Sequence, residues 1–275
     1  MKFDMHCHTK EGSIDSKVSL EKYILLLKAK GFGGMVITDH NSYNGYRHWK
    51  NNLKDKKYTD FVVLKGIEYD TINSGHMLII MPEGVKPRIL ELRGMPISLL
   101  ITIVHTFGGI LGPAHPCGEK YLSYANTRSY RKNRDLLEKF DFIETFNACE
   151  SPERNEAAKA LAKHYQLPGI GGSDAHKEVC VGYAYTELPD SVTCESELIT
   201  YVKSKPDIHC GGSYYRGTTK EKMGRINRLL VYSFWVYNKT AGFLKVRKRR
   251  SQSKFLKVNM GDGSSSCKRD LPSKA

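Results

Sequence analysis

Near its beginning the chain reads Phe3-Asp4-Met5-His6-Cys7-His8-Thr9, a run in which two histidines are separated by one residue. Side chains at positions i and i+2 of a β-strand point to the same face, so an extended backbone lets His6 and His8 bind one ion together. Cys7 points the opposite way, and we expect it to be packed in the interior rather than to bind metal. A lone His-x-His pair often has no metal, so its meaning depends on what accompanies it elsewhere.

The same spacing recurs in Gly172-Ser173-Asp174-Ala175-His176, which follows a run of small residues from Pro168 to Gly172. We expect that run to be a short buried strand that opens into a loop, so that Asp174 and His176 face one cavity. In the run that ends at Asp39 and His40 the two polar residues are adjacent. Only His40 is expected to reach a metal directly, with Asp39 orienting it or a neighbouring imidazole.

Candidate ligands of this kind stand near the edges of apolar runs over much of the chain. They comprise six of the ten histidines and three carboxylates, namely His6, His8, Asp15, His40, Glu68, His76, His115, Asp174 and His176. Imidazole nitrogens and carboxylate oxygens are common protein ligands of zinc, manganese and iron. The joint pattern favours a polynuclear metal hydrolase.

Apolar runs, several rich in Val, Ile, Phe and Tyr, alternate with helix-like stretches. The runs predicted to be strands cover residues 2–7, 34–38, 61–67, 77–81, 110–114, 141–146 and 181–186. One helix is predicted over residues 19–31, capped by Ser19 and ended by Gly31, and another over residues 154–165. Such alternation is typical of an α/β fold built on a parallel sheet.

Barrels of alternating strands and helices carry their catalytic groups at the carboxyl ends of the strands. Five candidates stand at such ends, namely His8, His40, Glu68, His115 and Asp174. His76 does not, because it begins its predicted strand. Asn147 and Arg154 follow the strand predicted at 141–146 and are candidates to line the pocket.

These motifs resemble those of the polymerase and histidinol phosphatase (PHP) domain family. Residues 3–9 are similar to its first motif, 37–41 to its second, 66–68 with His76 and 114–116 to its third, and 172–176 to its fourth. The resemblance covers roughly residues 1–190. It implies a distorted seven-stranded (β/α)7 barrel, like a TIM barrel, that holds up to three divalent ions at the carboxyl ends of its strands.

The resemblance also implies how the ligands are shared. One ion is assigned to His6, His8, Glu68 and Asp174, a second to Glu68, His76 and His115, and a third to Asp15, His40 and His176. Asp15 departs from the family pattern, because some relatives carry histidine there. A carboxylate at this position shifts the preference from zinc towards manganese or iron.

Composition limits the class of protein. With 275 residues, 40% of them hydrophobic, the chain can form one good core and little more than one domain. No stretch reaches the roughly 18 apolar residues that a membrane-spanning helix requires, and no signal-peptide pattern precedes the first predicted strand. Seven cysteines with no Cys-x-x-Cys pair favour a reducing compartment. We expect a cytoplasmic protein without a transmembrane segment.

The net charge of +14 is unevenly distributed. Residues 217–275 contain 15 Lys and Arg against 3 Asp and Glu, which leaves 28 against 26 for residues 1–216. We therefore predict a nearly neutral catalytic barrel over 1–216, a basic and partly apolar helical extension over 217–250, and a disordered tail over 251–275. The extension could pack against the barrel, bind nucleic acid, or contact a membrane surface or partner protein.

The chemistry follows from charge. Three divalent ions held by six neutral imidazoles and three carboxylates leave a formal charge of +3, which favours an anionic phosphate ester over a neutral substrate. Divalent ions lower the pKa of bound water from 15.7 to about 7, so hydroxide is available without a protein nucleophile. We predict hydrolysis of a phosphorylated small molecule or nucleotide terminus, with Asp39, Glu68 and His176 acting in catalysis.

Two other functions fit the same residues. One is a 5′-to-3′ exonuclease that acts on short single-stranded nucleic acid. The other is a nucleic-acid-binding or polymerase-accessory module of the PHP type, in which the metal is only structural and residues 217–275 carry the function.

Overall fold

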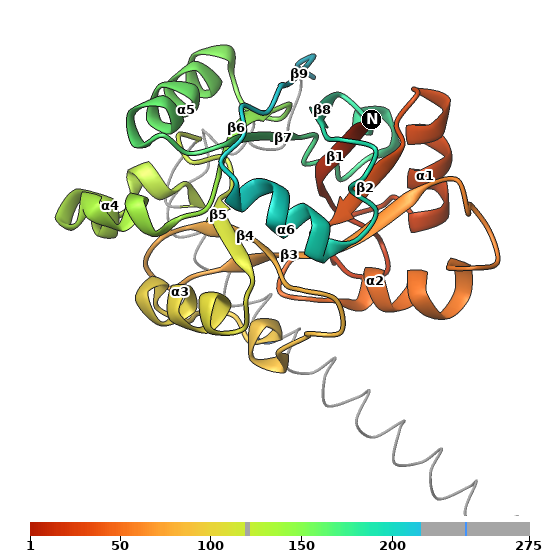
Figure 1. Ribbon diagram of the computed structural model, residues 1–275, viewed down its shortest axis with the longest axis horizontal. Coiled ribbons are helices and arrows are strands. Elements are labelled where there is room, and N and C mark those ends of the chain that lie inside the picture. The colour runs from red at the N-terminus through yellow and green to blue at the C-terminus, as the bar shows by residue number, and fades with distance from the viewer. Residues whose placement is uncertain (119–121, 216–239, 241–275) are drawn as a thin grey trace, which may run out of the picture. The chain divides into compact units, whose positions relative to one another are not determined.

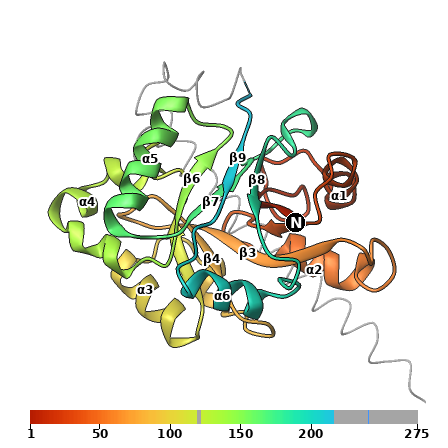
Figure 2. The ribbon, with the colours of Figure 1, turned by 45° about the horizontal axis from the view of Figure 1, so that its top comes forward.

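The computed structural model of the protein describes residues 1–118 and 122–215, together with Thr240. Within these ranges the chain forms an α/β fold around a strongly curled sheet (Figures 1 and 2). The predicted extension over 217–250 and the predicted tail over 251–275 lie outside the described residues, Thr240 excepted.

The main sheet has seven strands in the order β5-β4-β3-β2-β1-β8-β9, and β6 and β7 form a separate pair. The strands are β1 (Lys2–Cys7), β2 (Gly34–Ile37), β3 (Val62–Asp70), β4 (His76–Ile80), β5 (Ile110–Pro113), β6 (Ile143–Asn147), β7 (Gly169–Gly172), β8 (Ala184–Glu187) and β9 (Cys210–Gly212). Each predicted strand corresponds to one of these. The short run at 168–172 is β7, whereas β9 was not predicted, because Cys-Gly-Gly is not an apolar run.

The prediction of a parallel sheet is wrong for four pairings. Strands β1, β2 and β3 pair in parallel, as do β6 and β7. In contrast, β3 with β4, β4 with β5, β1 with β8 and β8 with β9 are antiparallel. Only residues 71–75 connect β3 to β4, and a parallel crossover needs a dozen or more residues. The direction of β4 is therefore reversed by the shortness of this turn.

The β6–β7 pair lies between the two halves of the curled sheet, beside β1 on one side and β5 on the other. The amide of Asp174, just after β7, donates to the carbonyl of His6 in β1 at 2.9 Å. On the other side, the amide of Asp141 donates to the carbonyl of Leu111 in β5, also at 2.9 Å. Main-chain hydrogen bonds thus connect the β6–β7 pair to the curled sheet on both sides.

Most of the helices lie around the outside of the sheet, whereas the one over residues 195–203 packs on its inward-facing side (Figures 1 and 2). The helices are α1 (Leu20–Ala29), α2 (Asn44–His48), α3 (Ile97–Thr106), α4 (Arg128–Lys132), α5 (Pro152–Tyr165) and α6 (Glu195–Lys203). The prediction for α1 is confirmed, since the Ser19 side chain accepts a hydrogen bond from the Lys22 amide and Gly31 follows the helix with a φ of 76°. The second predicted helix is α5.

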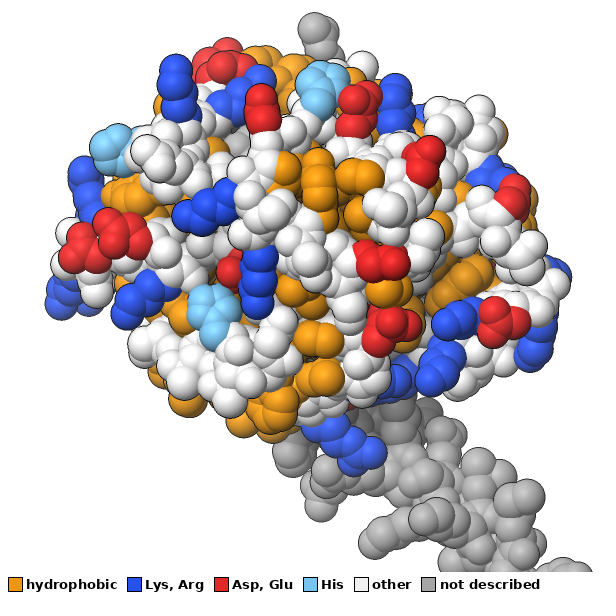
Figure 3. Space-filling model, viewed as in Figure 1, with side chains coloured by type: hydrophobic (Ala, Val, Ile, Leu, Met, Phe, Trp, Pro, Cys, Tyr) orange, Lys and Arg blue, Asp and Glu red, His pale blue; other side chains and the backbone are white. Residues whose placement is uncertain are grey.

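Inward-facing residues of the strands form a core cluster with one face of α6. Phe3, Val36 and Leu64 belong to it together with Leu198 and Val202 of that helix. Cys7 is fully buried in a neighbouring cluster, as expected for a packed thiol. On the face shown in Figure 3, basic and acidic side chains are interspersed. No helix among the described residues is long and apolar enough to cross a membrane.

Candidate metal centre

All nine predicted ligands gather at one edge of the sheet. His6 and His8 stand at the end of β1, His40 follows β2, and Glu68 lies near the end of β3. His76 belongs to the same edge because β4 runs antiparallel to β3, and its first residue therefore pairs with Asp70. The apparent exception in the sequence is thus explained by strand direction.

The deepest group contains His6, His8, Glu68 and Asp174, all with at most 3% of their surface exposed. Nε2 of His6 lies 3.0 Å from Nε2 of His8. Nε2 of His8 is in turn 3.3 Å from Oε2 of Glu68 and 3.3 Å from Oδ1 of Asp174. Four potential metal-ligand atoms from three separate parts of the chain therefore converge on one point.

Glu68 also faces a second group through its other oxygen. Oε1 of Glu68 is 2.8 Å from Nδ1 of His76 and 3.2 Å from Nε2 of His115. Its two oxygens thus face two different sets of imidazoles. This arrangement suits a carboxylate that bridges two cations.

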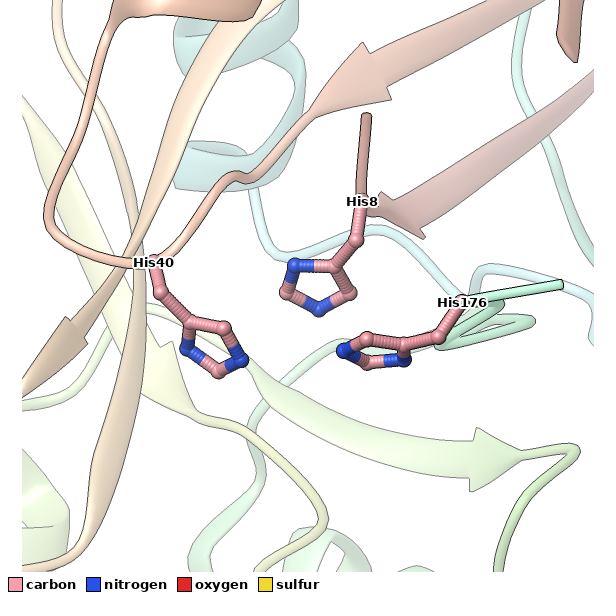
Figure 4. Close-up of side chains that lie close together, drawn as sticks. All are labelled: His8, His40 and His176. Carbon is pink, nitrogen blue, oxygen red and sulfur yellow. The ribbon is translucent and has the colours of Figure 1, made fainter. Parts of the chain in front are cut away.

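The third group lies nearer to solvent. Oδ2 of Asp15 is 3.5 Å from Nε2 of His40 and 3.3 Å from Nε2 of His176. Figure 4 shows the rings of His40 and His176 with a nitrogen turned towards each other and the ring of His8 beside them. The ring centroid of His8 lies 4.5 Å from that of His40 and 4.3 Å from that of His176.

Two buried carboxylate oxygens in this cluster lack a hydrogen-bond donor among the described residues. Oε2 of Glu68 and Oδ1 of Asp70 form no hydrogen bond of normal geometry with the described residues, although imidazole nitrogens approach Oε2 of Glu68 to 3.0 Å. Burying a carboxylate oxygen is costly unless it has a hydrogen-bond donor or binds a cation. Four sets of three residues hold their ligand atoms within 4.8 Å of one another. The residues present therefore fit divalent ions.

The pKa of Glu68 also fits a site for divalent ions. Burial by itself raises the pKa of the Glu68 carboxyl, but the imidazoles of His40, His76 and His6 outweigh burial and hold that pKa well below its usual range. The imidazoles therefore favour the ionised form of Glu68. A buried, charged carboxylate is costly unless it is paired or binds a cation.

The two histidines of β1 differ in their ionisation. Burial and the neighbouring rings of His176 and His40 lower the pKa of His8, which favours the neutral form that can bind a cation. Burial also lowers the pKa of His6, but the three carboxylates around it reverse the effect and raise that pKa well above its usual range. A cation at His6 thus competes with a proton.

Five of the six imidazoles have an orienting partner on their second ring nitrogen. The pairs are His6 with Glu144, His8 with Ser13, His76 with Asp70, His115 with Ser123, and His176 with the main-chain oxygen of Asp174, at 2.8, 3.2, 3.2, 3.4 and 3.0 Å respectively. Such partners fix the tautomer and the ring orientation of a metal-binding histidine.

Asp39 lies behind this layer rather than in the pocket. Its carboxylate accepts hydrogen bonds from the amide and hydroxyl of Thr9, at 2.6 and 2.8 Å, and from the hydroxyl of Ser13 at 3.1 Å. Burial raises its pKa to about 7. Ser13 is also hydrogen-bonded to His8, so Asp39 is connected to that imidazole through one hydroxyl.

Sequence reasoning missed Glu144 and Asp70. Glu144 was read as part of the apolar strand at 141–146, although it is 1% exposed and contacts His6. Asp70 had a usable signal, since it stands two residues after Glu68 on a strand and so shares its face. Asn147, a candidate to line the pocket, donates to Glu144 at 3.1 Å and to Asp174 at 3.3 Å.

Two protein-family models match this chain. The family model described as "PHP domain" matches residues 4–174, and one described as "PHP-associated" matches residues 152–205. No curated protein matches the chain at a significant level.

Several solved structures share the fold. PsfC from Pseudomonas syringae PB-5123 is 17% identical with a TM-score of 0.56, over 87% of this chain and 98% of that one. A candidate metal-dependent phosphoesterase from Bifidobacterium adolescentis is 16% identical with a TM-score of 0.50, over 63% of this chain and 87% of that one.

The lesion-specific endonuclease EndoQ from Pyrococcus furiosus is 20% identical with a TM-score of 0.54, over 76% of this chain and 57% of that one, so this chain spans little more than half of it. Identities this low carry the fold alone. The family model, however, covers more than half of this chain and includes all but the last of the nine gathered ligands. The chain belongs to the PHP domain family.

Proposed function

We propose that this protein is a metal-dependent phosphoesterase that hydrolyses a phosphate ester of a small molecule or of a nucleotide terminus. Family membership and the gathered ligands support the broader statement, a metal-dependent hydrolase. The observation that carries the proposal is Glu68, which is 1% exposed and faces imidazoles with both oxygens. A buried, ionised carboxylate in this setting is best satisfied by two cations.

The proposed ligand sets are the three that the family resemblance implies, with Glu68 shared between the first two. Zinc, manganese and iron all suit imidazole and carboxylate ligands. When bound, such ions make hydroxide available at neutral pH and stabilise charge on phosphoryl oxygens.

Charge supports an anionic substrate. Five carboxylates, rather than three, stand in or directly against the cluster, namely Asp15, Glu68, Asp70, Glu144 and Asp174. Arg93 forms an ion pair with Asp70. Three divalent ions, set against these five carboxylates and Arg93, would leave a formal charge of +2, one less than the sequence alone suggests. A phosphate ester offsets a positive pocket, whereas a neutral amide does not.

The exposure of the ligands indicates how substrate would enter. The side chains of Asp15, His40 and His176 are 46%, 25% and 29% exposed, whereas that of Glu68 is 1% exposed. We therefore propose that a phosphate group approaches from the side of Asp15 and His176. His176, which holds its Nδ1 against the main-chain oxygen of Asp174, keeps Nε2 turned to this opening.

For the three residues predicted to act in catalysis, we propose distinct roles. Glu68 holds cations in both inner groups, and His176 acts at the opening, where protons can be exchanged with solvent. Asp39 acts through Ser13 by holding the ring of His8, since its oxygens are occupied by Thr9 and Ser13. A role for Asp39 in direct proton transfer has less support.

We also propose that β1 to β7 form the distorted seven-stranded barrel of this family, with β8 and β9 added along β1. Support comes from the main-chain hydrogen bonds that connect β7 to β1 and β6 to β5. This closure would place the ends of β1, β2, β3, β5 and β7 around one opening.

A nucleic-acid substrate is the second candidate. One observation favours it, the structural likeness to endonuclease Q, which has been crystallised with a 27-mer duplex that carries an abasic lesion. In this chain residues 217–275 contain 15 basic residues against 3 acidic ones, and the basic side chains could contact phosphates. A role for that segment in binding nucleic acid remains a proposal.

The function is tested by removing metal with a chelator and adding back Mn²⁺, Zn²⁺ or Fe²⁺ separately. Hydrolysis of p-nitrophenyl phosphate and of the dinucleotide pApA is measured after each addition. We expect no turnover of the stripped protein and recovery with at least one ion. Asp174→Asn should abolish recovery, while Asp190→Asn, at an exposed site away from the cluster, should not.

Turnover of pApA without p-nitrophenyl phosphate would favour the exonuclease. If neither substrate is hydrolysed with any ion, the phosphoesterase proposal is wrong.

A further inference from the structure

Tyr215 contacts the loop that carries two of the proposed ligands. Its hydroxyl lies 3.1 Å from the main-chain oxygen of Ser173 and 3.2 Å from that of Asp174, and it donates to them. The side chain is partly buried, and its ring packs edge to face on Tyr183 with centroids 5.7 Å apart. Tyr215 lies beyond both segments that the family models match, 4–174 and 152–205.

The backbone of this loop is held in an unusual conformation. Asp174 has a φ of 51°, in the left-handed region that a non-glycine residue seldom adopts. Its amide donates to the carbonyl of His6 at 2.9 Å, and the amide of Ser173 donates to Asp4 at 2.8 Å. Strand β1 and its side chains therefore fix the amide side of the loop.

Tyr215 supplies the contacts on the carbonyl side. The main-chain oxygen of Asp174 is approached by the Tyr215 hydroxyl and, at 3.0 Å, by Nδ1 of His176. One hydroxyl thus helps to hold the carbonyl that also orients the imidazole of His176. A strained backbone persists only when its surroundings hold it from several sides, and Tyr215 provides one of these restraints.

We propose that Tyr215 is a positioning residue that sets the placement of Asp174 and His176, and through them the affinity of the centre for divalent ions. The inference rests on the proposed metal centre, in which these two residues belong to different ligand sets. Loss of the hydroxyl should therefore weaken binding in both sets.

The test uses the full chain with Tyr215→Phe, which removes the hydroxyl and keeps the ring. The matched control is Tyr214→Phe, because Tyr214 is 37% exposed and its ring packs on Phe146 with centroids 5.2 Å apart. Equilibrium dialysis against Mn²⁺, followed by elemental analysis, gives the dissociation constant and the number of ions per chain. Thermal unfolding of the metal-free proteins gives a separate measure of folding.

We expect Tyr215→Phe to weaken Mn²⁺ binding about tenfold, as is typical when a group that orients a metal ligand is removed. The control should bind Mn²⁺ as the wild type does. The metal-free unfolding temperature of Tyr215→Phe should stay close to that of the control, whereas a merely structural role would lower it without a specific loss of ions.

Unchanged Mn²⁺ affinity in Tyr215→Phe overturns the inference. So does a loss of affinity that is matched by Tyr214→Phe or explained by unfolding of the metal-free protein. Ion binding is measured without substrate, so a wild type that binds Mn²⁺ but hydrolyses no phosphate ester would contradict the proposed function and leave this test valid. A wild type that binds no ion contradicts both.

Discussion

Glu68 faces five of the other proposed ligands, all of them imidazoles. Its Oε1 faces His76 and His115, and its Oε2 faces His6, His8 and His40. Its motif could be identified from sequence because Gly-Ile-Glu follows an apolar strand. What sequence could not show is that both oxygens are used, since that depends on five imidazoles from four other segments of the chain.

Glu68→Gln tests this residue. Replacing one oxygen by an amide nitrogen removes an anionic ligand from two sets at once, so the variant should lose at least one ion per chain and about a hundredfold or more in turnover. Elemental analysis and p-nitrophenyl phosphate hydrolysis measure the two effects. Glu83→Gln, at an exposed position, is the control. Full ion content in Glu68→Gln would exclude a bridging role.

At the scale of elements, the β3–β4 hairpin brings His76 into the centre. The turn between the strands is too short for a crossover, so β4 returns antiparallel and His76 pairs with Asp70. Sequence periodicity located both strands and the ends of α1, because apolar spacing and the Ser19 cap are local features. It could not give the direction of β4, and it hid Glu144 inside an apolar run, because both depend on contacts between distant segments.

Gly75 makes this hairpin possible, and its replacement is predicted to disturb the centre. Gly75 has a φ of 70°, and an added Cβ would lie 2.3 Å from the main-chain oxygen of Leu122. Gly75→Ala should therefore destabilise the metal-free protein by about 1–3 kcal/mol and reduce ion binding at His76. Urea unfolding and elemental analysis measure these effects.

Gly84→Ala is a matched control for the hairpin variant. Gly84 has a φ of 74° but no heavy atom within 4 Å of an added Cβ, so it carries the backbone strain without the clash. If the two variants lose equal stability and both keep a full set of ions, close packing at the hairpin has no part in forming the centre.

At the scale of the whole molecule, the centre is a dense group of interacting charges, and its stability should depend on pH. Burial lowers the pKa of His6, His40 and His176, but the neighbouring carboxylates outweigh burial and raise it. A raised pKa contributes stability below the ordinary histidine value near 6.5, and that stability is lost as pH rises through the folded-state value. Glu68 and Asp15 have lowered pKa values, so their contribution is lost instead as pH falls.

The raised pKa values of these imidazoles should therefore make the metal-free protein lose stability as pH rises above about 6.5. Saturating Mn²⁺ should oppose this loss, because a cation replaces the protons that leave the imidazoles. Thermal unfolding from pH 5 to 9, with and without Mn²⁺, measures both curves. A metal-free curve that rises steadily with pH would show that the imidazoles are not paired with these carboxylates.

The most direct measurement is the anomalous scattering of crystals grown with Mn²⁺. If the account is right, difference peaks appear on both sides of Glu68, one near His6, His8 and Asp174 and another near His76 and His115, with a third near Asp15. Gathered imidazoles and carboxylates with no anomalous peak beside Glu68 would contradict it.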